Sequence, residues 1–224
     1  MSETILSATM AQLWSPSSEF MSYGSRMRVN RVVDLGGLYF PSGTVCAFDA
    51  LVPARAQRPT ARLPVGLYRV QVSIVAHAQG SDPAPAIGAV RLGAAHGSRV
   101  AEWRRSVGPG SDGSVLGICD ASVYDAVGGD LPYETLDVTP NFKEQRTASA
   151  RARASADASC SVDPEVWWNA IVVSTVRSGV PASFVAFTSG GDGGYPLYWG
   201  RTRAGKVSEL CCVTSPIDGW RRRR

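Results

Sequence analysis

The clearest pattern of apolar and polar positions lies between Tyr68 and Ala76. Four apolar side chains there alternate with Arg69, Gln71 and Ser73, which is the period of a strand with one buried face. Shorter apolar stretches recur and are separated by glycine- and proline-containing turns; they lie at 32–33, 38–40, 44–48, 87–92, 100–107, 115–119, 167–176, 184–188, 195–199 and 206–214. We therefore expect an all-β fold, a sandwich or partly open barrel of about nine or ten strands.

Two turns in this pattern predict hairpins. Pro41-Ser-Gly43 separates the apolar stretches 38–40 and 44–48, and residues 202–205 precede the last strand. Short turns of this composition commonly join neighbouring antiparallel strands. We expect each turn to connect two strands that pair with each other.

Three segments depart from the strand pattern. Residues 3–14 have an apolar stripe that predicts a short N-terminal helix, and residues 21–30 are polar and irregular. Residues 140–158 are rich in alanine and arginine, which favours a helix with little to bury, so this insertion is either a surface helix or a mobile segment. We expect a helical and irregular segment over 1–30, a single β domain over 31–216 and a basic tail over 217–224.

One glycine-rich stretch stands out for its chemistry. Four glycines surround the single carboxylate of Asp192, between the strand ending at Thr188 and the aromatic strand that follows. Glycine lets other groups approach the backbone closely and reaches φ > 0 without strain. The stretch therefore predicts either a very tight turn or a site.

The same stretch resembles a known family. The motifs Ser189-Gly, Gly191-Asp-Gly193, Tyr195-Pro and Trp199-Gly, together with 41–53, 63–70 and Trp168-Asn-Ala, occur in the order typical of the bacterial family called domain of unknown function 4241, which is common in actinobacteria. The similarity runs from about residue 36 to 214. It implies the family's fold and a bacterial origin, and it implies no activity.

Asp192 is the candidate catalytic residue. A carboxylate beside aromatic side chains could act as a general acid or base, and rings could stack on a flat ligand. The other candidate binding residues are Ser189, Gly191, Gly193, Tyr195, Tyr198, Trp199 and Asp120. The alternative is that Asp192 only accepts hydrogen bonds from its own turn, because Asp-Gly is a favoured turn pair.

Other chemistry has weaker support. Asp49 and Asp120 each end a predicted strand, and strand ends that converge with Asp192 could bind a divalent cation. The chain lacks an Asp-x-Asp-x-Asp-Gly loop and has only His77 and His96, so we predict no metal site and no cofactor. The glycine stretch lacks the Gly-Lys-Ser/Thr of a phosphate-binding loop.

Composition and charge limit the setting. The formal net charge of +4 is accounted for by Arg221–Arg224, so the rest of the chain shows no signal for nucleic acid. Five cysteines without regular spacing indicate free thiols in a reducing compartment. No apolar run has the length of a membrane span, and the N-terminus with Glu3 lacks the basic region of a signal peptide. We expect a cytoplasmic protein.

Two functions are consistent with this sequence. The first is a small-molecule-binding protein or a cofactor-free acid/base enzyme, of hydrolase, cyclase or isomerase type, with its site at residues 190–194. The second is a protein-binding module without catalysis, such as an immunity or accessory protein. The sequence indicates neither a nucleic acid nor a membrane as partner, and it leaves the oligomeric state open, a homodimer included.

Overall fold

The computed structural model describes residues 4–6, 10–50, 56–79, 85–94, 99–112, 115–126, 170–177, 180–189 and 191–218. Within them the strands are β1 (Thr4–Leu6), β2 (Glu19–Ser22), β3 (Ser25–Phe40), β4 (Val45–Asp49), β5 (Gly66–His77), β6 (Ala86–Ala94), β7 (Glu102–Ser106), β8 (Gly110–Ser111), β9 (Val115–Asp120), β10 (Ala170–Arg177), β11 (Val180–Thr188), β12 (Gly193–Gly194), β13 (Leu197–Arg201) and β14 (Val207–Val213). The helical elements are the 3-10 helix η1 (Gln12–Trp14) and the α-helix α2 (Ala121–Ala126). The predicted β fold is confirmed.

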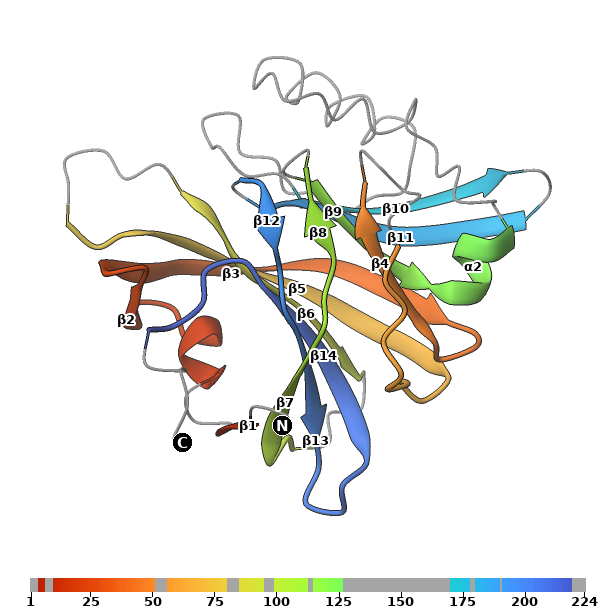
Figure 1. Ribbon diagram of the computed structural model, residues 1–224, viewed down its shortest axis with the longest axis horizontal. Helices are drawn as coiled ribbons and strands as arrows, with labels where there is room; N and C mark the ends of the chain where they lie inside the picture. The colour runs from red at the N-terminus through yellow and green to blue at the C-terminus, as the bar shows by residue number, and fades with distance from the viewer. Residues whose placement is uncertain are drawn as a thin grey trace.

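Two antiparallel sheets form the body of the protein. The larger has eight strands in the order β1-β7-β13-β14-β6-β5-β3-β2, and the smaller has four in the order β10-β11-β9-β4. The larger sheet is strongly twisted and the smaller one lies across one of its faces (Figure 1). Irregular register between β3 and β5 and between β13 and β14 adds to the curvature, because a bulge bends a strand and increases its twist.

The main core lies between the two sheets. It includes Phe40, Val72 and Trp199 from the larger sheet and Leu116 and Phe187 from the smaller one, all at most 2% exposed. The alternation predicted for residues 68–76 is confirmed: Tyr68, Val70, Val72 and Ile74 on β5 are buried in this core. We call the faces that meet here the inner faces of the sheets.

Each outer face carries a further apolar cluster. On the larger sheet, Tyr198, Cys211 and Val213 pack with Leu13 from η1 and Ile217 from the C-terminal segment. On the smaller sheet a cluster includes side chains from β4, β9, β11 and α2, namely Cys46, Phe48, Cys119, Tyr124 and Phe184. Both sheets are therefore covered on parts of both faces.

The N-terminal region differs from the sequence prediction. Thr4–Leu6 form β1, paired with β7, so helical structure begins only at Met10 and ends with η1. Residues 21–30, predicted to be irregular, form the end of β2, the turn after it and the start of β3. There Arg26, Arg28 and Asn30 are exposed while Met27 and Val29 are buried. The prediction was wrong because polar outward residues outnumber the buried ones in these strands.

The two predicted hairpins have different outcomes. Thr202–Gly205 joins β13 and β14, which pair as expected. Residues 41–44 instead carry the chain from β3 in the larger sheet to β4 in the smaller one, so the first hairpin is wrong. A turn fixes only the local direction of the chain, and the apolar residues on either side of this turn are buried by different sheets.

Some predictions fall on residues outside the described ranges. These are the insertion 140–158, the tail from 219 onward, His96, Cys160 and the pair Trp167-Trp168. Among the described residues, no helix has the length and apolar character needed to cross a lipid bilayer.

Candidate functional site at the glycine loop

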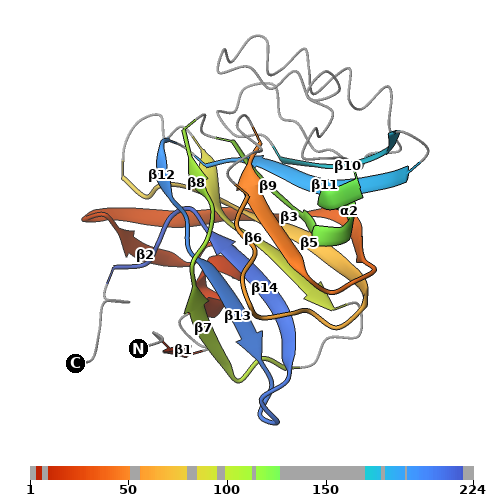
Figure 2. The same ribbon diagram turned by 45° about the vertical axis from the view of Figure 1, so that its right-hand side comes forward.

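The glycine loop, residues 189–195, connects β11 of the smaller sheet to β13 of the larger one; Gly190 is not described. Gly193–Gly194 form β12, which pairs with Gly110–Ser111 of β8. The resulting two-stranded ribbon lies beside the end of β4 in both views (Figures 1 and 2). The loop therefore lies at a rim where the two sheets are bridged.

Tyr195 fixes the shape of the loop. Its hydroxyl donates to the carbonyl of Gly191 at 2.5 Å, and the hydroxyl of Ser189 donates to the same oxygen at 3.1 Å. The amide of Tyr195 donates to the carbonyl of Pro109 at 2.9 Å. Burial raises the pKa of the Tyr195 phenol, and the hydrogen bond with Ser189 opposes that shift. The ring is thus a structural anchor that leaves only part of its surface to solvent.

Changing Tyr195 to phenylalanine tests this anchor. The variant loses one partly buried hydrogen bond, so unfolding should become easier by about 1 kcal/mol at neutral pH. A phenol whose pKa is raised by folding contributes stability below its unfolded pKa and loses it as pH rises through the folded value. The difference in unfolding free energy between wild type and Tyr195→Phe should therefore shrink above about pH 10. Urea unfolding at a series of alkaline pH values measures this difference. A constant difference would contradict the role of the phenol proton.

Asp192 lies exposed at the tip of the loop. A Cβ placed on Gly191 or Gly194 would meet no atom within 4 Å, and Gly193 has φ +153°, which disfavours other residues. Within the described part of the chain, no hydrogen bond holds the Asp192 carboxylate. The structure thus presents this carboxylate to solvent with open space beside it.

Tyr198 and Trp199 do not line this loop. They are neighbours on β13, so their side chains face opposite sides of the larger sheet. Tyr198 is 3% exposed in the outer cluster and Trp199 is 2% exposed in the core between the sheets. Of the three predicted aromatic residues, the structure brings only Tyr195 to the glycine loop.

Asp120 also lies elsewhere. On the antiparallel strands β4 and β9, Asp120 pairs with Val45 and Asp49 with Leu116, so the two aspartates end their strands at opposite edges of the smaller sheet. Asp49 lies at the end of β4 that is next to the β8–β12 ribbon. It is 1% exposed and accepts a hydrogen bond from the amide of Asp112 at 2.6 Å. Convergence of the strand-end aspartates fails because antiparallel neighbours end at opposite edges. Among the described residues, no group of three or more His, Cys, Asp or Glu side chains could hold a metal ion.

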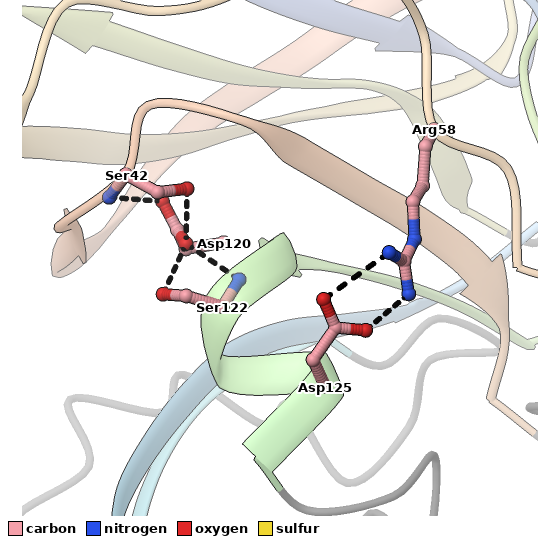
Figure 3. Close-up of polar contacts among 5 residues, drawn as sticks. All are labelled: Ser42, Arg58, Asp120, Ser122 and Asp125. Atoms are coloured by element: carbon pink, nitrogen blue, oxygen red, sulfur yellow. Dashed lines mark hydrogen bonds and ion pairs between the residues drawn. The ribbon is translucent and has the colours of Figure 1, made fainter.

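The Asp120 carboxylate is a structural hub (Figure 3). It accepts hydrogen bonds from the amide and hydroxyl of Ser42 at 2.9 and 2.7 Å, from the amide of Gly43 at 3.0 Å, and from the amide and hydroxyl of Ser122 at 2.8 and 2.6 Å. Burial raises the pKa of Asp120, but these bonds to the charged form outweigh it and leave the pKa below its usual value. The carboxylate fastens the β3–β4 turn to the first turn of α2.

Sequence reasoning missed Tyr23, which is 77% exposed. It stands with Gly24 at the turn between β2 and β3, with φ values of +50° and +76°, as in a type I′ hairpin. Asp218 accepts from the amides of Tyr23 and Gly24 at 3.1 and 2.7 Å. Burial is the main cause of the raised pKa of Tyr195, and the charge of the Tyr23 phenol adds to that shift. The Tyr-Gly pair between alternating residues was the available signal, but Asn or Asp is the usual residue at this position.

Comparison with known proteins gives a family and nothing further. No curated protein and no solved structure matches the chain. The model of the family described as "Protein of unknown function (DUF4241)" matches residues 38–212, a range that contains the Asp120 hub and the glycine loop. The chain belongs to the DUF4241 family of proteins of unknown function.

Proposed function

We propose that this protein binds a small molecule at the glycine loop, through the Asp192 carboxylate and the rings of Tyr23 and Tyr195. The observation that carries the proposal is an exposed carboxylate with open space beside Gly191 and Gly194, next to a half-buried phenol. A carboxylate strengthens hydrogen bonds to amines and hydroxyls, and tyrosine faces attract cations. A flat amine or polyol is the ligand class that fits best.

The conformation of Tyr23 supports its place in this site. A non-glycine residue at φ +50° is strained, and such residues cluster at functional positions. Two hydrogen bonds to Asp218 hold the turn in this conformation. A segment from the other end of the chain therefore holds this turn, and the Tyr23 ring stays exposed beside it.

Binding fits this site better than catalysis. General acid/base residues usually work in sites where burial or neighbouring charges tune their pKa, whereas Asp192 is solvent-exposed. Hydrolase, cyclase or isomerase chemistry would require a ligand or a closing segment to desolvate Asp192. Burial of the free thiols Cys46, Cys119, Cys211 and Cys212 supports a reducing compartment such as the cytoplasm as its setting.

A second candidate function is protein binding, and one observation favours it. Tyr39 and Leu67 are paired residues of β3 and β5, and with Val65 they are 51%, 56% and 62% exposed. Exposed apolar side chains that lie together are typical of contact surfaces. Replacing Tyr39 and Leu67 by serine would abolish a complex formed at this surface and leave ligand binding at the glycine loop unchanged.

Mutation of Asp192 and Tyr23 tests the binding site. Flat amines and polyols would be screened by thermal shift, and affinities of the hits measured by calorimetry. Asp192→Asn should weaken binding about tenfold or more by removing the charge, and Tyr23→Ala should weaken it several-fold. Asp192→Asn should change unfolding free energy by less than about 1 kcal/mol, because the carboxylate is exposed.

The matched control is Asp34→Asn, an exposed carboxylate of β3 that pairs with Arg69, and it should leave affinity unchanged. Equal affinity in wild type and both site variants would refute the proposed site. A loss of about 1–3 kcal/mol in the stability of Asp192→Asn, with unchanged affinity in the folded protein, would instead assign Asp192 to the structure of the turn.

A further inference from the structure

Two cysteines face each other across the strands β4 and β9. Cys46 and Cys119 are directly paired in the antiparallel register. Both side chains lie in the outer cluster of the smaller sheet and both are 0% exposed, and each thiol shifts the pKa of the other. The structure therefore holds two free thiols side by side, although 72 residues separate them in the sequence.

The Cα separation at this pair lies in the range of a disulfide, and closing the bond requires the two Cβ atoms to move closer together. The amide of Ala121 donates to the carbonyl of Thr44, and the amide of Ala50 donates to the carbonyl of Val115. Thr44–Ala121 and Ala50–Val115 lie two and four residues from Cys46–Cys119 in the same register. Because hydrogen-bonded pairs alternate with non-hydrogen-bonded pairs along an antiparallel ladder, Cys46 and Cys119 also form a hydrogen-bonded pair. Cα atoms at such positions are about 5.5 Å apart, within the roughly 4.4–6.8 Å that a disulfide spans.

We propose that Cys46 and Cys119 are a site of reversible oxidation, at which exchange with a small disulfide such as oxidised glutathione forms a disulfide between β4 and β9. In the first step the Cys46 thiolate attacks the glutathione disulfide, forms a mixed disulfide and releases one glutathione thiolate. In the second step the Cys119 sulfur attacks the Cys46 sulfur and loses its proton to solvent, and the second glutathione thiolate leaves. Two protein thiols are oxidised and one glutathione disulfide is reduced to two thiols.

The surroundings distinguish the roles of the two sulfurs. The hydrogen bond from Cys119 lowers the pKa of Cys46, and the nearby guanidinium of Arg58 acts in the same direction. Burial raises the pKa of Cys119. Because the thiolate is the attacking species, Cys46 attacks first and Cys119 resolves the mixed disulfide.

An exposed ion pair lies close to Cys46. Arg58 pairs with Asp125 of α2 (Figure 3), and their side chains are 47% and 54% exposed. The guanidinium also lies 5.8 Å from the ring centre of Tyr124. Exposed ion pairs contribute little stability. The free energy needed to open such a surface element locally is far smaller than the free energy of global unfolding. Transient separation of Arg58 and Asp125 gives a small disulfide a route to Cys46.

The vicinal pair Cys211-Cys212 provides an internal comparison. These neighbours on β14 lie in different clusters on opposite faces of the larger sheet, so they do not face each other. Burial raises the pKa of Cys212 to about 12 and that of Cys211 well above its usual value. Among the described residues, neither sulfur faces another thiol across a strand pair, and neither has the lowered pKa of Cys46.

The test uses the full-length chain with Cys160→Ser, which removes the one cysteine outside the described residues. The folded protein is incubated with oxidised glutathione, alkylated with iodoacetamide in denaturant and analysed by peptide mass spectrometry. We expect a peptide linked through Cys46 and Cys119, lighter by two hydrogens than the reduced pair. Dithiothreitol should restore both thiols.

Two single variants separate the steps. Cys119→Ser should accumulate glutathione on Cys46, and Cys46→Ser should give neither a linked peptide nor glutathione on Cys119. Cys212→Ser is the matched control and should oxidise at the wild-type rate, with circular dichroism showing that each variant is folded. Recovery of Cys46 and Cys119 as alkylated thiols would overturn the proposal. Glutathione spread evenly over all cysteines, or appearing only in denaturant, would overturn it equally.

Discussion

Replacing Asp120 by alanine should lower the unfolding free energy by about 3–5 kcal/mol. The substitution leaves the amides of Ser42, Gly43 and Ser122 without their common acceptor, and each unsatisfied buried donor costs about 1–3 kcal/mol, less where water reaches it. It also removes the side-chain link between the β3–β4 turn and the start of α2, so that the backbone hydrogen bond from the amide of Ala121 to the carbonyl of Thr44 remains there. Urea unfolding followed by circular dichroism measures the loss.

The control for this substitution lies five residues away. Asp125→Ala removes an exposed carboxylate of α2, the helix that follows Asp120, and its ion pair with Arg58, which should cost at most about 1 kcal/mol. Similar losses for the two variants would show that the hydrogen bonds to Asp120 matter no more than a surface charge. Asp120→Asn, which keeps one acceptor oxygen, should fall between wild type and Asp120→Ala.

The stability difference between wild type and Asp120→Ala should also depend on pH. Folding lowers the pKa of Asp120 from a reference value of 3.8, so its contribution is complete above that value and disappears as pH falls through the folded pKa. The two proteins should therefore differ fully at pH 6 and progressively less below about pH 4. A difference that grows on acidification would contradict the assignment of the charged form as the bonded one.

Replacing Gly108 by alanine should destabilise the protein by about 3 kcal/mol or more. A Cβ at this position would lie 1.8 Å from the carbonyl oxygen of Tyr195 and 3.0 Å from the amide nitrogen of Leu197. Both neighbours are backbone atoms at the start of β13, so no side-chain rotation relieves the clash and the strand itself has to move. Because Tyr195 anchors the glycine loop, the same variant should also lose ligand affinity there.

Gly194→Ala is the matched control for this steric effect. Its Cβ would meet no atom within 4 Å, and it lies on β12, which pairs with β8 shortly after Gly108 in the sequence. Thermal unfolding should place it within about 0.5 kcal/mol of wild type. If Gly108→Ala is as stable as Gly194→Ala, the close packing between residue 108 and the start of β13 is not a constraint on the fold.

The sequence around the glycine loop predicted the loop itself but not which side chains lie near it. The glycines around Asp192 predicted a loop between two strands, and the structure has that loop with the carboxylate at its tip. Tyr198 and Trp199 were grouped with it because they are near in sequence, but the period of two in a strand sends them to opposite faces of the sheet. Tyr23, from the other end of the chain, adds to the raised pKa of Tyr195, and sequence spacing carries no information about such an interaction.

The sequence by itself determined the class of fold. Alternation at Tyr68–Ile74 specifies a strand with one buried face, because side chains on successive residues point to opposite sides of a sheet. The turn at Thr202–Gly205 specifies the β13–β14 hairpin in the same local way. These features depend on residues within a few positions of each other, which is why they can be predicted from a single chain.

Only the tertiary structure decided which strands pair and what each strand-end aspartate does. Asp49, Asp120 and Asp192 all follow apolar strands in the sequence, yet Asp49 and Asp120 are buried at opposite edges of one sheet and Asp192 is exposed. The direct pairing of Cys46 with Cys119 likewise depends on the register between β4 and β9. Register and sheet order are set by burying both faces of these strands at once, a condition that involves the whole chain.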